Sequence, residues 1–351
     1  MTDLDERIVL TLREHAEGSV DAGLLLAGAV SRGRVRVRRR RTAVGTALGM
    51  VAVLGAGVAI GPADLFGSDA VPTGPARPAS AVVPAAPPLA DGVPGASARP
   101  DLVGADPNVL HFGFTPGGPR YLSWSVEGGV EMARLDMGGR SVTLELAASA
   151  EAFPRYAQGL PGGIYVPTKK GVFDGSVSQA DTFNGKPVWL RHWQPTPGVY
   201  ARASVIAQDQ RDLAAVAAGL RLDRAYHCGG PLRLTALPTD ARVTNCEVSV
   251  ERFPAGLDVL LTLGRPTVSG LRVGLSYAVA IAEERTRGNR TIAGKPANRT
   301  PQGDALELLG FPKAHLTADF GLPFQGFSEE DAATVLAGAR VAEPLDEPAS
   351  W

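Results

Sequence analysis

The sequence has few of the residues from which catalytic and metal sites are most often built. Of its 351 residues, only two are cysteine and five are histidine. It contains no His-Glu-x-x-His pair, no Gly-x-Ser-x-Gly elbow, no Gly-x-x-x-x-Gly-Lys-Ser/Thr loop and no Ser-x-x-Lys. No motif therefore assigns a catalytic residue, a cofactor site or a metal site, and we expect a protein without catalytic activity.

The chain also lacks an excess of charge of either sign. Lys and Arg number 35, Asp and Glu number 36, and the formal net charge is −1. No overall field attracts nucleic acid to such a chain. The arginines are nevertheless concentrated, with a dense basic run between residues 32 and 41. We attribute this run to membrane topology and expect no nucleic-acid partner.

Charged residues are absent from the next segment, Ala43 to Gly61. An apolar run of about 18–20 residues is long enough to cross a lipid bilayer as a helix, and a basic block beside it stays in the cytoplasm. We therefore expect a transmembrane helix at residues 42–61, with residues 1–41 in the cytoplasm and the rest outside. A signal peptide cleaved after about residue 61 is the alternative.

The cytoplasmic segment, residues 1–41, has one apolar stripe. Leu4, Ile8 and Leu12 recur at helical spacing and predict one face of an amphipathic helix. Two interpretations fit this face equally: it lies on the inner leaflet of the bilayer, or it docks onto a cytoplasmic partner.

A linker follows the apolar run. Residues 62–100 contain nine prolines, many alanines and glycines, and almost no large apolar side chains. Such a segment buries too little surface to fold, and its prolines stiffen and extend it. We expect residues 62–100 to be a disordered spacer.

The folded mass is expected in residues 101–351, where apolar and polar residues alternate in short runs separated by Gly, Pro and Asp. This pattern is typical of antiparallel strands. The runs are 121–126, 141–146, 188–193, 201–206, 243–250, 257–263 and 271–281.

Two motifs occur twice, in the same order. Residues 182–188, TFNGKPV, match residues 291–297, TIAGKPA. Residues 212–222, DLAAVAAGLRL, match residues 331–341, DAATVLAGARV. The first motif predicts a turn entering a strand, and the second a short helix that ends at glycine. We expect two related extracytoplasmic modules, residues 101–224 and 225–351, of the α+β class, each an antiparallel sheet with a C-terminal helix.

The two cysteines, Cys228 and Cys246, lie outside the membrane in this layout, where cysteines tend to be oxidised. His227 is adjacent to Cys228, but no second Cys or His lies at zinc-binding spacing. We therefore predict a disulfide between Cys228 and Cys246 in preference to a metal site.

One strand combines aromatic and cationic side chains. Alternation places Trp189, Arg191 and Trp193 on one face. The first interpretation is a half-buried strand with Arg191 stacked between two indoles. The second is a recognition surface for an envelope ligand, either peptide or carbohydrate.

The layout resembles single-pass membrane proteins of actinobacteria that accompany extracytoplasmic-function sigma factors, including anti-sigma-factor-like proteins. The resemblance is carried by the acidic start from Asp3 to Glu14, the apolar cluster 24–30, the basic run 32–41 and the Ala/Gly-rich apolar run. It implies a cell-membrane location and a cytoplasmic sigma factor as partner of residues 1–41. Many such proteins carry a cytoplasmic zinc motif, but this chain has no cysteine before Cys228.

The sequence thus predicts a membrane-anchored binding or sensing protein without catalytic activity. An anti-sigma-factor-like regulator acting through residues 1–41 is the first alternative. A cell-envelope hydrolase whose site is assembled from distant residues is the second.

Overall fold

The computed structural model describes residues 83–115, 117–154, 173–266, 268–281, 286–321 and 326–351. All of these residues belong to one compact unit, 79–351. The segment 1–41 with Leu4, Ile8 and Leu12, the apolar run 42–61 and the linker up to residue 82 lie outside the described residues. Within the part described, no helix is long and apolar enough to cross a membrane.

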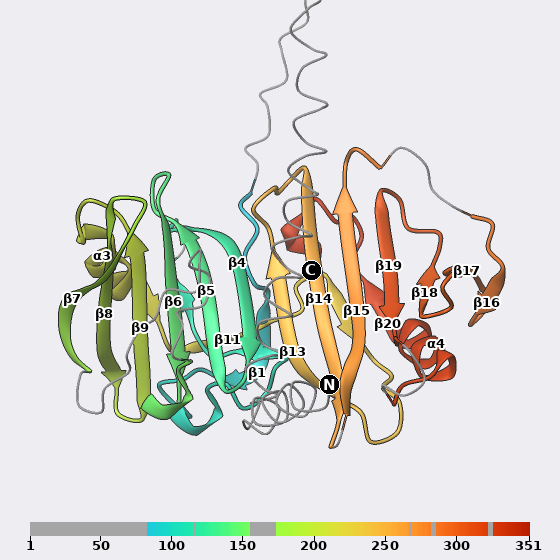
Figure 1. Cartoon of the computed structure of the whole chain (residues 1–351), viewed down its shortest axis with the longest axis horizontal. Helices are drawn as coiled ribbons and strands as arrows, with labels where there is room; N and C mark the ends of the chain where they lie inside the picture. Colours follow the sequence, from blue (N-terminus) through green and yellow to red (C-terminus); the bar gives the residue numbers. More distant parts are fainter. Residues whose placement is uncertain (1–82, 116, 155–172, 267, 282–285, 322–325) are drawn as a thin grey trace, which may run out of the picture. The chain divides into compact units, whose positions relative to one another are not determined.

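Thirteen strands form one antiparallel sheet, in the order β16-β17-β18-β19-β15-β14-β13-β4-β5-β6-β9-β8-β7 (Figure 1). One half contains β4 (Arg120–Glu127), β5 (Val130–Asp136), β6 (Ser141–Ala147), β7 (Asp174–Phe183), β8 (Lys186–Thr196) and β9 (Val199–Ile206). The other contains β13 (Arg242–Ser249), β14 (Gly256–Arg265), β15 (Val268–Ala278), β16 (Arg290–Ile292), β17 (Lys295–Arg299), β18 (Ala305–Leu308) and β19 (Ala314–Asp319). The expected strands are therefore present, but they belong to one sheet.

The expected α+β class is wrong, because the described chain is mainly β. It contains two α-helices, α3 (Arg211–Gly219) and α4 (Glu329–Gly338), of nine and ten residues. The sheet also runs on between the two expected modules, since β4 pairs with β13. Unpaired edge strands expose backbone N–H and C=O groups, and this pairing removes two such edges at once.

The pairing between β4 and β13 forms the seam of the sheet. Trp124 lies opposite Val248, and Val126 lies opposite Cys246. From the seam outward, each half begins with a three-stranded meander, β4-β5-β6 or β13-β14-β15, and continues with strands that return from the far edge. The two halves are therefore wound alike, with β19 adding one strand beside β15 in the second half.

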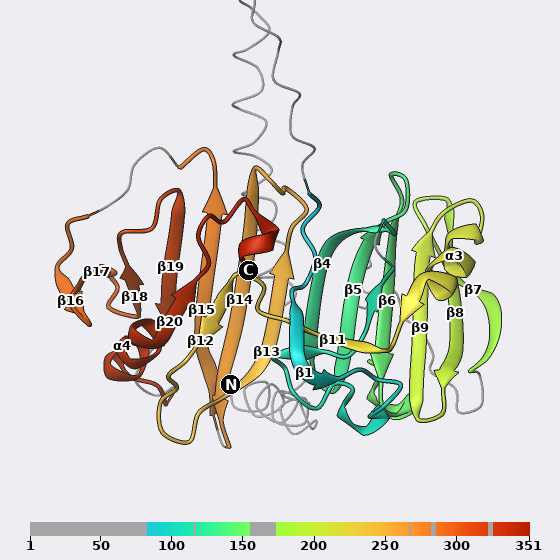
Figure 2. The ribbon, with the colours of Figure 1, turned by 180° about the vertical axis from the view of Figure 1, so that it is seen from behind.

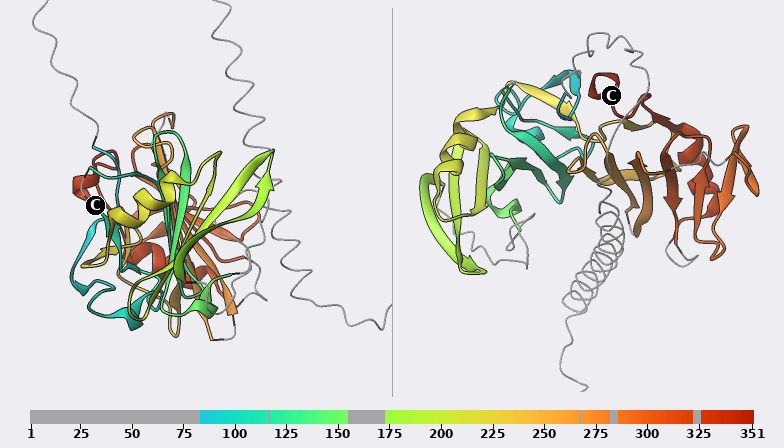
Figure 3. Two further views of the ribbon diagram at one scale, coloured as in Figure 1. Left: turned by 90° about the vertical axis from the view of Figure 1, so that its left-hand side faces the viewer. Right: turned by 90° about the horizontal axis from the view of Figure 1, so that it is seen from above.

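Short strands and both helices cover one face of this sheet, and Figures 2 and 3 show them as a second layer. The short strands are β1 (Leu89–Pro94), β2 (Val109–Leu110), β3 (Gly113–Phe114), β10 (Leu220–Arg221), β11 (Arg224–His227), β12 (Leu232–Leu234) and β20 (Ala339–Val341). The 3-10 turns are η1 (Pro100–Leu102), η2 (Ala150–Ala152) and η4 (Pro348–Ser350). Trp124, Leu144 and Leu213, all at 0% exposure, are part of the core between the layers.

The opposite face of the first half carries polar side chains. Cross-strand pairs align Thr143 with Ser204, and Glu145 with Arg202. The Arg202 guanidinium donates to Glu145 at 2.7 Å, and both side chains are fully buried. His192 lies opposite Arg202 on the next strand. Strand alternation thus separates an apolar face from a polar face, and each face has its own packing.

Part of the expected spacer is folded. From residue 83 onward it contains β1, which pairs with β11, while Ala85 and Ala96 are buried in the core. Proline and alanine left this segment without a local signal for structure. Pairing with β11, which lies more than 120 residues later, supplies the backbone partners that the composition does not predict.

Both Gly-Lys-Pro motifs form the expected turns. Positive φ angles of 49° at Asn184 and 73° at Gly185 turn β7 into β8. Angles of 48° and 80° at Ala293 and Gly294 turn β16 into β17. Two consecutive positive φ values are typical of type I′ hairpins, which match the twist of the flanking strands.

The predicted disulfide is confirmed. Cys228 and Cys246 are bonded and fully buried. Cys228 follows β11 in the covering layer, whereas Cys246 lies on β13 at the seam. The Trp124 indole N–H donates to the Cys228 carbonyl at 2.6 Å from the neighbouring strand β4. The bond therefore links the chain that crosses between the two halves to the centre of the sheet.

Candidate functional site

A groove of about 490 Å³ lies between β8 and α3. Side chains of β8 form one wall, and α3 with the segment that leaves it forms the other. The lining residues are Arg191, Trp193, Gln194, Pro195, Ala214, Ala217, Ala218, Leu220 and Leu222. Its size is within the range of about 300–1,000 Å³ that is usual for ligand sites.

The helical wall is open because of its alanines. Leu213 and Val216 point into the core and are 0% and 1% exposed. The other positions of the helix that meet the groove, Ala214, Ala217 and Ala218, are all alanine. A methyl group fills little volume, so the side of α3 that faces β8 leaves space that a longer side chain would occupy.

A partly buried ion pair fixes this helix to the sheet. The Arg140 guanidinium, from the turn between β5 and β6, donates to the Asp212 carboxylate at 2.8 Å. Asp212 lies in the first turn of α3, where a carboxylate also complements the helix dipole. The helical wall of the groove is thus held from below, and does not depend on a ligand for its position.

Arg191 and Trp193 supply the distinctive chemistry of the strand wall. The Arg191 guanidinium carbon lies 5.4 Å from the centre of the Trp193 ring, within cation–π range. Arg191 Nε is buried and has no hydrogen-bond partner among the described residues. Buried N–H groups are nearly always paired, so this nitrogen marks a guanidinium that the described residues leave incompletely hydrogen-bonded.

Trp189 has a different role from the two residues with which it shares a face. Its indole N–H donates to the Ala207 carbonyl at 3.1 Å, and its ring packs against the main core. It does not line the groove. Of the three side chains predicted as a recognition surface, Arg191 and Trp193 meet at the groove, whereas Trp189 supports the sheet beneath it.

The other face of β8 holds a histidine that sequence reasoning did not single out. His192 is 5% exposed, and its Nε2 has no hydrogen-bond partner among the described residues. Burial, reinforced by the nearby Arg202 guanidinium, lowers the pKa of His192 to about 4. The imidazole is therefore neutral near pH 7. Alternation with Arg191 and Trp193 indicated only that His192 lies on the opposite face of β8, and not that this face is buried.

A second buried histidine is bonded to a carboxylate through its Nδ1. His111 Nδ1 lies 2.6 Å from Glu131 Oε1, and the same carboxylate accepts the backbone N–H groups of His111 and Gly104. This arrangement ties the loop before β3 to β5. Within the described ranges, no group of three or more His, Cys, Asp and Glu side chains is placed to hold a metal ion.

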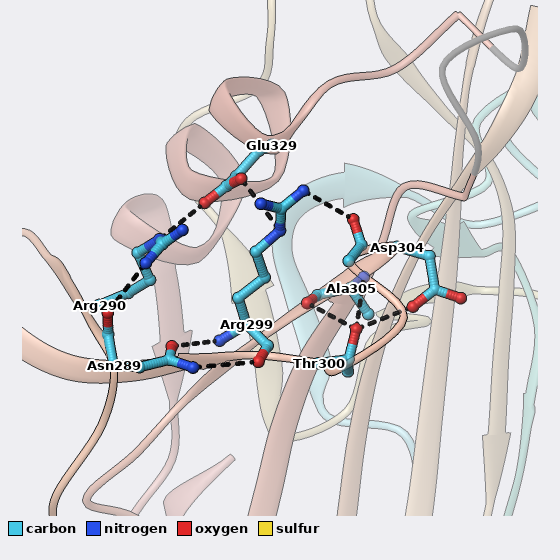
Figure 4. A network of polar contacts seen from close by, with 8 residues as sticks. Asn289, Arg290, Arg299, Thr300, Asp304, Ala305 and Glu329 are labelled. Carbon is cyan, nitrogen blue, oxygen red and sulfur yellow. Dashed lines mark hydrogen bonds and ion pairs between the residues drawn. The ribbon is translucent and has the colours of Figure 1, made fainter.

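The second half of the sheet closes the corresponding hairpin against its helix (Figure 4). Arg290 Nε lies 3.0 Å, and Arg299 Nε 3.2 Å, from the two carboxylate oxygens of Glu329 at the start of α4. The Asn289 side chain bonds the backbone of Arg299 in both directions. The hairpin β16–β17 is thereby tied to α4.

The first half lacks the side chains for this tie. The two repeated motifs place Asp181 where the second half has Arg290, Leu190 where it has Arg299, and Gln210 where it has Glu329. None of these can form the same ion pairs. The hairpin β7–β8 and helix α3 are thus without the side-chain clamp of the second half, and the groove lies between them.

A smaller and more apolar pocket of about 300 Å³ lies near the start of the described chain. It is lined by Pro84, Ala85, Arg120, Tyr121, Val250, Phe253 and Pro254. Burial raises the pKa of the Tyr121 phenol, so this hydroxyl stays protonated. The pocket contains no buried polar group without a partner among its described residues, and it is a weaker candidate than the groove.

Comparison with known proteins does not assign a family. No protein-family model and no curated protein matches the chain. The solved complex of Pseudomonas aeruginosa MucA and MucB aligns over 70% of this chain and 96% of its own, with 12% identity and a TM-score of 0.21. MucB in complex with MucA(peri) aligns over 70% and 97%, with 10% identity and a TM-score of 0.20. Similarity at this level assigns neither fold nor partner.

Proposed function

We propose that this protein is a non-catalytic binding protein of the cell envelope, which captures a segment of a partner in the groove between β8 and α3. The observation that carries the proposal is the unpartnered Arg191 Nε beside Trp193 in an open groove. Aromatic and arginine side chains are the ones that most often dominate binding energy. The proposal does not require a catalytic residue.

An extracytoplasmic location is part of this proposal. Its support is the disulfide between Cys228 and Cys246, because disulfides persist in oxidising compartments. The basic run at 32–41 and the apolar run that follows would direct the chain across the membrane and either anchor it or be removed. Protease treatment of intact cells tests the location, since exposed residues 101–351 would be digested without lysis.

Exposed alanines on α3 allow a matched crosslinking test of whether a partner binds in the groove. Ala214, Ala215 and Ala218 are all exposed positions on α3, but only Ala214 and Ala218 line the groove. A photo-crosslinking amino acid placed at residue 218 in intact cells should capture a discrete partner. The same group at residue 215 should not, and Arg191→Gln should abolish the product at residue 218. Equal products at residues 215 and 218 would contradict a groove-centred function.

A regulatory version of the function involves residues 1–41. The apolar stripe of Leu4, Ile8 and Leu12 and the resemblance to anti-sigma-factor-like proteins favour it. We propose that binding outside would be communicated to a cytoplasmic partner through this segment. Full-length protein and a chain lacking residues 1–41 should then recover different cytoplasmic proteins from membranes. If both chains recover the same cytoplasmic proteins, residues 1–41 act only in membrane targeting.

A further inference from the structure

We infer that the groove receives a peptide segment in which a carboxylate side chain lies beside a large apolar side chain. The inference rests on the proposed function and specifies its ligand. Arg191 would receive the carboxylate, and the wall formed by Trp193, Ala217 and Leu220 would receive the apolar side chain.

The positive charge of the Arg191 guanidinium indicates that the ligand is negatively charged. A guanidinium stays protonated in proteins and has donors only, and its planar fork matches a carboxylate in two parallel hydrogen bonds. The carboxylates on and beside α3 are already engaged elsewhere. Asp209 binds Arg211 at 2.8 Å, and Asp212 binds Arg140. Arg191 is therefore not supplied with a counter-charge by its neighbours on the helix.

On the other face of the strands β8 and β9, a buried arginine has hydrogen-bond partners within the chain. Arg202 binds Glu145 through two nitrogens and donates to the Pro154 carbonyl at 3.0 Å. On Arg191, one strand away on the opposite face, Nε has no hydrogen-bond partner among the described residues. A carboxylate from outside would give Arg191 the partner that Arg202 has within the chain.

The apolar requirement follows from the rest of the lining. Trp193 and Leu220 are each 9% exposed, so a ligand meets the edge of a packed apolar wall. Pro195 and the α3 alanines extend this wall along the groove. Removing apolar surface from water favours binding, whereas a small free carboxylate would leave most of the wall exposed. A ligand with an apolar side chain next to the carboxylate contacts both the apolar wall and Arg191.

A peptide fits better than a polyanion. Arg191 is the single cationic side chain among the lining residues, which suits one negative charge. Gln194 adds an amide that can both donate to and accept from a peptide backbone. The groove is open to solvent, so a chain can enter and leave it. A free carboxylate without the apolar neighbour is a separate outcome of the test below.

The test uses the full chain and a library of random dodecapeptides displayed on phage. Peptides enriched on the protein, and not on the Arg191→Gln or Ala218→Trp variant, should carry Asp or Glu beside Leu, Ile, Phe or Trp. Ala215→Trp, on the solvent side of α3, is the control that should keep binding. Thermal unfolding of each variant establishes that it is folded.

Synthetic peptides then isolate the charge. Replacing the selected Glu by Gln should weaken binding about 10–100-fold, the usual range for a charged hydrogen bond. Arg191→Gln should weaken the Glu peptide and leave the Gln peptide unchanged. Free N-acetylglutamate should compete only at far higher concentration than the peptide.

Each contrary result identifies what has failed. The enriched peptides could lack an acidic residue and still bind less well to Ala218→Trp. That result would contradict the requirement for a carboxylate and would leave the groove as the binding site. Equal competition by N-acetylglutamate would overturn the peptide in favour of a small carboxylate. No enrichment over Ala218→Trp would overturn both this inference and the proposed function.

Discussion

The guanidinium of Arg265 lies 2.7 Å from the carboxylate of Asp331, and joins the end of β14 to the first turn of α4. Arg140 and Asp212 form the same connection to α3 in the other half. Each helix is thus held at its start by an arginine from a hairpin of the sheet. The alanine-rich helices have no long apolar face to hold them on the sheet. The two ion pairs therefore help to fix their positions.

Asp331→Asn should lower the free energy of unfolding at pH 7 by about 1–2 kcal/mol, since it weakens both an ion pair and a helix cap. Ser328 and Asp331 form a capping box at the start of α4. Urea unfolding measures the loss. Asp319→Asn is the control, because its pair with Arg272 is more exposed and should matter little. Equal losses would contradict the cap argument.

The pH dependence of Asp331 has a definite sign. Burial alone would raise the pKa of this carboxyl, but bonds from Ser328 and Arg265 outweigh burial and lower the pKa. A lowered folded-state pKa stabilises the protein above the unfolded value of 3.8, and the stabilisation is lost as pH falls through the folded value. The difference in stability between wild type and Asp331→Asn should shrink as the medium is acidified into this range.

His192→Gln should flatten the stability profile between pH 6.5 and about 4. The folded protein binds the imidazole proton only near pH 4, whereas the unfolded chain binds it near 6.5. The unfolded state therefore binds more protons in this window, and the stability of the wild type falls as pH drops through it. Urea midpoints at pH 7, 5 and 4 test this. A fall of the same size in His192→Gln would show that other groups cause it.

Glu145→Gln should cost about 3–5 kcal/mol, because it leaves the Arg202 charge buried with incomplete compensation. Replacing both residues, as in Glu145→Leu with Arg202→Met, should cost much less than the single change. A double-mutant cycle by urea unfolding measures the coupling. Additive losses would show that the two charges act independently.

Replacing both cysteines by alanine should destabilise the protein by about 3 kcal/mol, the loop-entropy value for a loop of this length. The bonded residues are 18 apart in the sequence and fully buried. Oxidised wild type should resist a mild thiol reductant while folded. Unfolding by urea with and without the reductant compares the two states. An unchanged midpoint after full reduction would contradict a stabilising role.

Local chemistry was readable from the sequence. Asn-Gly and Ala-Gly before Lys-Pro predicted two hairpin turns, and both are present at Asn184–Gly185 and Ala293–Gly294. Alternation predicted most strands and the shared face of Trp189, Arg191 and Trp193. The spacing and scarcity of cysteine predicted the disulfide. Each of these signals lies within a few residues of the structure it specifies.

Three features of the site and the fold needed the tertiary structure. Sequence did not show that Trp189 would bond the Ala207 carbonyl while Arg191 and Trp193 faced a groove. Nor did it show that His192 would be buried beside Arg202, or that β1 would form inside a proline-rich segment. All three depend on which distant element packs over a given strand.

The sequence by itself therefore determined turns, strand periodicity, helix starts and the cysteine pair, because these follow from backbone conformation and short-range chemistry. The tertiary structure alone decided that two similar halves share one sheet, and that one hairpin is tied to its helix by Glu329 while the other leaves a groove. The reason is physical: backbone groups at a strand edge can pair with any strand of suitable register. The sequences of β4 and β13 therefore do not by themselves specify that they pair, and the packing of the whole chain decides it.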